Sequence, residues 1–162
     1  MPAPILDLLV LQDELVDLLK TALADMRPAV HILTPADLAG EEAEGKDKAP
    51  GKAHPVPAVN VVYLGHKFSP DQERQRADGR ATLIAQLFAL ECVTKSVRSL
   101  KTGSAARNEG GVLAMRVFKA AVGARLPSAT GTVKFVPGPG PVYRGGMQYL
   151  PLVVSVDLGV VK

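Results

Sequence analysis

The apolar positions near the start of the chain recur every three or four residues. Between residues 5 and 25, polar and charged residues separate a broad apolar stripe made up of Leu8, Leu9, Leu11, Leu15, Leu18, Leu19, Ala22 and Leu23. This period is typical of an amphipathic α-helix that packs one side on a hydrophobic core. We expect the helix to stop where Pro28 forces Arg27 out of helical geometry.

Two short runs rich in apolar and β-branched residues, 29–33 and 58–64, predict strands. The chain between them, at 40–57, mixes both charges with Gly and Pro and has almost no large apolar side chain. Such a segment cannot bury enough apolar surface to offset its ordering entropy, so we expect a mobile charged loop. A second polar connection is expected at 65–79.

The segment 80–97 fits two structures. Its Ala and Leu content, with Leu83, Leu87 and Leu90 at helical spacing, slightly favours a helix. Gly79 before it and apolar residues on both alternating faces suit a long strand in the middle of a sheet. The local pattern leaves both structures open.

A helix is predicted from about residue 105 to residue 122, with Ser104 as its cap and Gly123 at the left-handed position that ends it. Strands are predicted at 132–136 and 147–156. The run VPGPGPVYRGG between them resembles a phosphate-binding loop only in its glycines. Its prolines lack the N–H groups that such a loop needs, and a strand follows, so we interpret it as a hairpin turn that carries Tyr143 and Arg144.

The composition limits the possible functions. The chain has 162 residues, which suits a single domain over 1–162, and 4% aromatic residues with no Trp. The formal net charge is +3, lower than strong nucleic-acid binders usually have. No apolar stretch approaches the length needed to cross a bilayer, and no signal peptide is predicted.

The sequence gives no indication of catalytic chemistry. The histidines, His31, His54 and His66, follow no metal-ligand spacing, and the single cysteine, Cys92, has apolar surroundings. We therefore expect no catalytic residue, no bound metal and no cofactor, and we do not expect an enzyme. Basic residues without intervening acids form a candidate phosphate-binding surface, although without interleaved aromatics a solvated or subunit-contacting face is favoured: Lys95, Arg98, Lys101 and Arg107.

The order of these segments resembles the tail terminator (tail-completion) proteins of tailed phages, most closely the Mu-like group. The resemblance lies in ILDLLVLQDELVDLL at the start, AVNVVYLG, VLAMRVFKAAVGARL, and the Gly-containing turn before YLPLVVSV. It implies an α+β fold with a mixed, mostly antiparallel sheet of about four to five strands flanked by two main helices, in the order α-β-β-β-α-β-β. It also implies that the segment matching 80–94 is a strand.

In that family the subunits form a hexameric ring that caps the tail tube, stops its polymerisation and joins the tail to the head connector. The resemblance thus implies a non-enzymatic virion protein at the neck-proximal end of the tail, assembled in the host cytoplasm. Its expected partners are other copies of itself, the tail tube protein and the head–tail connector, with no membrane and with DNA only passing through the ring. The candidate interface residues are Phe68, Arg74, Arg76, Tyr143 and Arg144. Two alternatives remain open: another neck or head-completion protein, and a small basic nucleic-acid-binding module.

Overall fold

The computed structural model describes residues 7–43, 54–69, 81–95, 103–144 and 146–161. The elements follow in the order α1 (Val10–Ala22), β1 (His31–Leu33), α2 (Pro35–Ala43), β2 (Ala58–Phe68), β3 (Ala81–Lys95), α4 (Gly103–Ala121), β4 (Lys134–Val136), β5 (Val142–Arg144) and β6 (Met147–Val161). The α+β class is confirmed. The sheet has six strands, slightly more than expected, and α2 is a helix that the sequence pattern did not predict.

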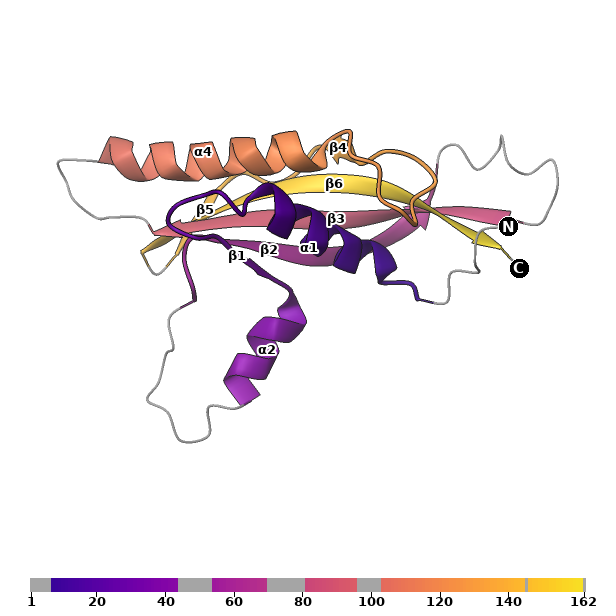
Figure 1. Cartoon of the computed structure of the whole chain (residues 1–162), viewed down its shortest axis with the longest axis horizontal. Helices are drawn as coiled ribbons and strands as arrows, with labels where there is room; N and C mark the ends of the chain where they lie inside the picture. The colour runs from indigo at the N-terminus through magenta and orange to yellow at the C-terminus, as the bar shows by residue number, and fades with distance from the viewer. Residues whose placement is uncertain (1–6, 44–53, 70–80, 96–102, 145, 162) are drawn as a thin grey trace.

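The sheet is mixed and mostly antiparallel. Its strand order is β1-β2-β3-β6-β4, with β5 also paired to β6. Only β1 and β2 run parallel to each other. The strands β3 and β6 pair along their whole length and form the long central ribbon of the molecule (Figure 1).

Both α1 and α4 pack on the same face of the sheet, α1 mainly over β2 and α4 over β3 and β6 (Figure 1). The buried core lies between these helices and the sheet, and its largest members are Leu11, Leu15, Leu19, Phe88, Leu90, Leu113 and Leu158. Burying a side chain of this kind stabilises the fold by about 1.5–3 kcal/mol. We call the opposite surface of the sheet the far face.

The segment 80–97 contains a strand, β3, so the slight local preference for a helix is wrong and the strand implied by the resemblance is confirmed. The reason is that both sides of β3 are covered. Phe88 and Leu90 face the helices, while Ala85 and Val93 on the far face are also fully or almost fully buried. A strand buried on both faces has no apolar–polar alternation, and its sequence then looks like that of a buried helix.

The first helix ends at Ala22, well before Pro28, so proline is not what stops it. Arg116 on α4 donates a 3.1 Å hydrogen bond to the carbonyl oxygen of Ala22 and forms an ion pair with Asp25. The guanidinium group of Arg116 holds the pKa of the Asp25 carboxyl below its ordinary value. These contacts satisfy the end of α1 and fasten it to α4.

The expected loop at 40–57 begins later than predicted, because residues 40–43 form the last turn of α2. Thr34 and Asp37 start this helix with a reciprocal cap, in which the Asp37 carboxylate accepts hydrogen bonds from the backbone N–H and the hydroxyl of Thr34, at 2.7 and 2.8 Å. Residues 44–53 lie outside the described part of the chain. The expectation of a mobile loop there is therefore untested.

Other boundaries also differ from the prediction. β2 continues to Phe68, past a bulge at Tyr63/Gly65, so residues 65–68 are strand and not connection. α4 begins at Gly103, which places Ser104 inside the helix and not at its cap. Gly123 has a φ of +82° and ends this helix as predicted.

The closing segment forms a more extended structure than the predicted hairpin. β4 pairs with β6 as expected, but β6 runs on to Val161, and a further strand, β5, occupies part of the connection. Tyr143 and Arg144 therefore lie on a strand and not in a turn. In the described part of the chain no helix is long and apolar enough to cross a membrane.

Candidate functional site

A polar cluster lies on the far face, where the chain enters β2. The side-chain amide of Asn60 donates a 3.1 Å hydrogen bond to Glu91 Oε2 and lies 3.1 Å from Nε2 of His54. Nδ1 of His54 lies 2.8 Å from the Pro55 carbonyl oxygen, which can only accept, so Nδ1 carries the proton and Nε2 accepts from Asn60. The lone pair of His54 Nε2 is therefore occupied by the hydrogen bond from Asn60. The cluster holds the segment before β2 on the sheet.

Cys92 cannot act as a nucleophile in this structure. Its side chain is 1% exposed, and burial, with a smaller contribution from Glu91, raises the pKa of the thiol to about 12. The thiol therefore stays protonated at neutral pH.

Nδ1 of His66 bonds to the Tyr63 hydroxyl at 2.8 Å. Across the described residues, no group of three or more His, Cys, Asp or Glu side chains is arranged to hold a metal ion.

The candidate phosphate-binding surface is only partly described. Lys95 is exposed at the end of β3, and Arg107 lies on α4 with its side chain outside the description. Arg98 and Lys101 lie outside the described residues. The same holds for Arg74 and Arg76, two of the candidate interface residues.

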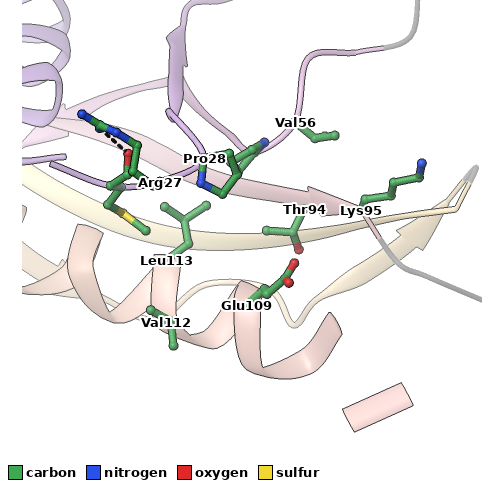
Figure 2. A pocket seen from close by; sticks show the side chains of 10 residues that line it. Arg27, Pro28, Val56, Thr94, Lys95, Glu109, Val112 and Leu113 are labelled. Atoms are coloured by element: carbon green, nitrogen blue, oxygen red, sulfur yellow. Dashed lines mark hydrogen bonds between the residues drawn. The ribbon is translucent and has the colours of Figure 1, made fainter. Parts of the chain in front are cut away.

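A pocket of about 470 Å³ lies where β3 ends beside the middle of α4 (Figure 2). We call it the end pocket. Its lining comes from segments far apart in the sequence and is mostly apolar: Met26, Pro28, Val56, Pro57, Val112 and Leu113, together with Thr94 and the charged residues Arg27, Lys95 and Glu109. Figure 2 shows that Leu113 on α4 points toward Pro28, while the amine of Lys95 and the side chain of Val112 point away from them. The volume falls in the range of roughly 300–1,000 Å³ that is typical of ligand pockets.

Thr94 gives the end pocket an unusual polar group. The residue is 4% exposed, and its hydroxyl oxygen is buried without a hydrogen-bond partner among the described residues. In Figure 2 the hydroxyl points toward Glu109 on α4. A buried hydroxyl without a partner is destabilising. The oxygen has almost no accessible surface and lies beside Gly110 of α4, so a ligand in the end pocket does not reach it in this structure.

A second exposed apolar surface lies at the opposite end of the sheet. We call it the distal patch, formed by Leu8, Leu9 and Phe68. Phe68 is 72% exposed and lies opposite Ile84 on β3, on the side of the sheet that carries the helices. The carbonyl oxygen of Leu8 accepts a 2.7 Å hydrogen bond from the buried side chain of Gln86, which fixes the start of α1 beside it.

The two surfaces are far apart on one side of the sheet. The distal patch lies beside Ile84 and the end pocket beside Thr94 on the same strand, which at about 3.3 Å per residue places them roughly 33 Å apart. Tyr143 and Arg144 on β5 pair with the start of β6, at the pocket end. The structure therefore leaves the exposed candidates Phe68 and Tyr143 at different ends of the molecule.

The end pocket was missed from the sequence because its lining is scattered along the chain.

These observations define an α+β domain with exposed apolar groups at both ends of one sheet, and with others on α4, on β4 and in the middle of β2. No protein-family model matches the sequence, and no curated protein sequence matches it. A solved structure, described as the virion of a native gene transfer agent (GTA) particle, contains a chain with a similar fold. The TM-score is 0.51 at 14% identity, and the match covers 92% of this chain and 94% of that one.

Proposed function

We propose that this protein is a virion structural protein that caps the tail tube as a hexameric ring, terminates tube polymerisation and joins the tail to the head connector. The observation that carries the proposal is the likeness to a chain of a gene transfer agent virion, which extends over nearly the whole of both chains. The order of elements, which resembles that of tail terminator proteins, supports the same role.

The placement of the exposed apolar surfaces also supports a ring subunit. A ring closes by heterologous contacts, in which one surface of a subunit meets a different surface of the next. The end pocket and the distal patch are two such different surfaces, located at opposite ends of the sheet. We propose a single domain over 1–162 with no enzymatic activity, located at the neck-proximal end of the tail and assembled in the host cytoplasm.

In this proposal the partners are other copies of the chain, the tail tube protein and the head–tail connector, while DNA only passes through the ring. Arg74, Arg76, Tyr143 and Arg144 remain candidate contact residues. Tyr143 is 58% exposed at the edge of the sheet, so it is accessible to a neighbour.

The test combines electron microscopy with tube assembly. The purified protein is imaged by negative staining, alone and after mixing with tail tube protein from the same genome. We expect rings, and we expect tubes that carry the ring at one end and no longer grow. A protein that stays monomeric and leaves tube growth unchanged would refute the proposal.

The same structural likeness fits a second virion position. The match is to a chain of a virion particle, and this is equally compatible with another neck or head-completion protein. Antibody labelling of intact particles separates the two candidates. Label at the junction of tube and neck supports the terminator, whereas label confined to the head portal supports the alternative.

A further inference from the structure

One edge of the sheet carries positive charge. Between Glu109 and Asp157 the chain contains five Lys or Arg residues and no Asp or Glu. Three of these bases belong to the outer edge formed by β4, β5 and the segment that leads from α4 to β4, which we call the basic edge: Arg125, Lys134 and Arg144. The acid next to this edge is Asp157 on β6, whose buried carboxylate pairs with Lys134.

The opposite edge of the sheet carries the other sign. It is formed by β1, which α2 follows directly, and we call these two elements the acidic edge. From residue 28 to residue 43 the chain contains three acidic residues and no Lys or Arg: Asp37, Glu41 and Glu42. Figure 1 shows α2 projecting beyond the sheet, away from α1 and α4. Lys20 on α1 is a base near Asp37, but the acids of α2 outnumber it.

The bases of the basic edge are not neutralised within the chain. Arg125 and Arg144 are exposed, and neither forms an ion pair with a described residue. Lys134 pairs with Asp157 at 3.0 Å, yet its side chain stays 49% exposed. The positive charge of this edge is therefore available to a partner.

The basic edge also presents main-chain hydrogen-bonding groups. The N–H of Thr130 donates to the carbonyl oxygen of Asp157 at 2.9 Å, so the odd-numbered residues of β6 direct their main-chain groups toward this edge. Their partners on β4 and β5 are engaged with β6, whereas Phe135 and Tyr143 direct their N–H and C=O groups outward. The side chains of these two residues are exposed, and among the described strands none pairs with the outer side of β4 or β5. An open edge of this kind is suited to contact with another chain.

The two edges lie at the same level along the strands. Leu33 of β1 pairs with Asn60, and the row continues through Glu91 to Pro151 on β6. Pro151 lies between the part of β6 that pairs with β5, at 147–149, and the part that pairs with β4, at 153–155. Copies placed side by side around an axis along the strands therefore bring the start of α2 beside β4 and β5 of the next copy.

A second copy of the chain is the partner that fits both edges. Each copy supplies one acidic edge and one basic edge, so a contact between unlike edges is electrostatically favoured. A contact between two edges of the same sign places like charges together and is disfavoured. The favoured contact is thus head-to-tail, which is the kind that closes a ring.

We propose that the acidic edge of one copy docks on the basic edge of the next copy, with α2 lying against β4 and β5 and covering Phe135 and Tyr143. This inference rests on the proposed function as a ring subunit, and it names the surfaces by which neighbouring copies meet.

Reversing single charges tests the contact. Ala39 is exposed on α2, and Lys and Glu have similar helix propensity, so Ala39→Lys and Ala39→Glu differ mainly in the sign of the added charge. Sedimentation velocity at low salt, with tail tube protein added where the chain alone stays monomeric, measures the association. We expect Ala39→Lys and Arg144→Glu each to weaken it about three- to tenfold, and Ala39→Glu to leave it unchanged or stronger. The control is Lys95→Glu on β3, in the middle of the sheet, which changes the net charge as Arg144→Glu does and is expected to have little effect.

The decisive measurement mixes the two weakened variants. In an equal mixture of Ala39→Lys and Arg144→Glu, the new lysine of one variant meets the new glutamate of the other, and the remaining pair of edges keeps its natural charges. We expect the mixture to associate within about twofold of the natural protein. A mixture that associates as weakly as its components would overturn the inference.

Cross-linking measures the geometry independently of charge. Ala39→Cys and Tyr143→Cys are mixed and treated with a short bis-maleimide, while the natural Cys92 is buried and stays unreactive. We expect a linked dimer from this mixture. Val112→Cys is the matched control, because Val112 and Tyr143 are both 58% exposed but Val112 lies on α4. Equal linkage of Ala39→Cys to both positions, or linkage of Tyr143→Cys only to itself, contradicts the contact.

The outcomes separate this contact from other partners and from the proposed function. Nucleic acid is the other partner that a basic edge attracts, and loss of DNA binding in Arg144→Glu with unchanged self-association would sink the inference. If rings form and cap the tube while the charge reversals and the cross-link have no effect, the contact is wrong and the function stands. If rings form through this contact but tube growth is unchanged, the contact stands and the proposed function fails. A chain that stays monomeric even with tube protein overturns both.

Discussion

Alanine at Gly138 offers a sharp test of how the Pro-Gly segment crosses the sheet. A Cβ atom at this position would lie 2.5 Å from Cγ2 and 3.2 Å from Cβ of Val153 on β6. At Gly140, two residues further on, an added Cβ meets nothing within 4 Å. The two glycines of the same run therefore differ. Gly138 allows the backbone to lie close to Val153, whereas Gly140 lies in open space.

The size of the effect follows from how little Val153 can move. Its side chain is 7% exposed, its χ1 angle is stiff because it is β-branched, and its strand is held between β3 and β4. Overpacking at such a site costs about 1–3 kcal/mol, while replacing glycine lowers the entropy of the unfolded chain and returns about 0.4–1 kcal/mol. We expect Gly138→Ala to lower the free energy of unfolding by about 1–2 kcal/mol. Gly140→Ala should be neutral or slightly stabilising.

The assay is urea denaturation followed by far-ultraviolet circular dichroism, at one protein concentration for all variants. Val153→Ala removes the closest methyl group, so the cost of Gly138→Ala should nearly vanish in a Val153→Ala background. The reasoning is refuted if Gly138→Ala is as stable as Gly140→Ala, or if its cost is unchanged without the valine methyl groups.

The remaining predictions concern a thiol, a helix cap and a strand edge. Burial raises the pKa of Cys92 to about 12, so from pH 9 upward the unfolded thiol ionises while the native one does not. The free energy of unfolding should then fall by about 1.4 kcal/mol per pH unit, a slope that Cys92→Ala removes in urea titrations. The hydrogen bonds from Thr34 lower the pKa of Asp37, so this cap is complete above the ordinary pKa of 3.8 and is lost as the pH falls through the lowered value. Asp37→Ala should destabilise α2 by about 0.5–1 kcal/mol in amide exchange near neutral pH, and a difference that persists at strongly acid pH would contradict this origin. Gln12→Leu removes a 2.8 Å hydrogen bond to the carbonyl oxygen of Val61, so it should lower the free energy of unfolding by about 1–3 kcal/mol. An unchanged midpoint in urea denaturation would contradict this.

The elements that could be predicted are those with a single buried face. The stripe of leucines around Leu11 and Leu15 defined α1, and Gly123 marked the end of α4 by the backbone conformation that it adopts. β3 was ambiguous for the opposite reason, because both of its faces are buried. The helix α2 left a signal that was overlooked: Thr34, a proline and then Asp37 form the cap that typically precedes a helix.

The end pocket could not be predicted from the chain. Its walls come from the turn after α1, the segment before β2, the end of β3 and the middle of α4. None of these segments has a motif, and only the packing of α4 and of the segment after α1 on the sheet brings Leu113 and Pro28 beside Thr94. Tyr143 is exposed, and its role as a contact residue stays a prediction. Strand β5 was not anticipated, since Val142–Arg144 is too short to show a period.

The outer edge of β2 is protected against pairing with strands of other molecules. An open strand edge tends to pair with strands of other molecules, and proteins prevent this with bulges, charges and covering side chains. β2 has such features along its length: Gln12 occupies the Val61 carbonyl, a bulge interrupts the strand at Gly65, and Lys67 adds charge before the end. Extended strand pairing is thereby disfavoured, and what remains accessible is the last residue with its side chain. An open edge along the whole of β2 would favour unlimited strand addition, and these features limit it.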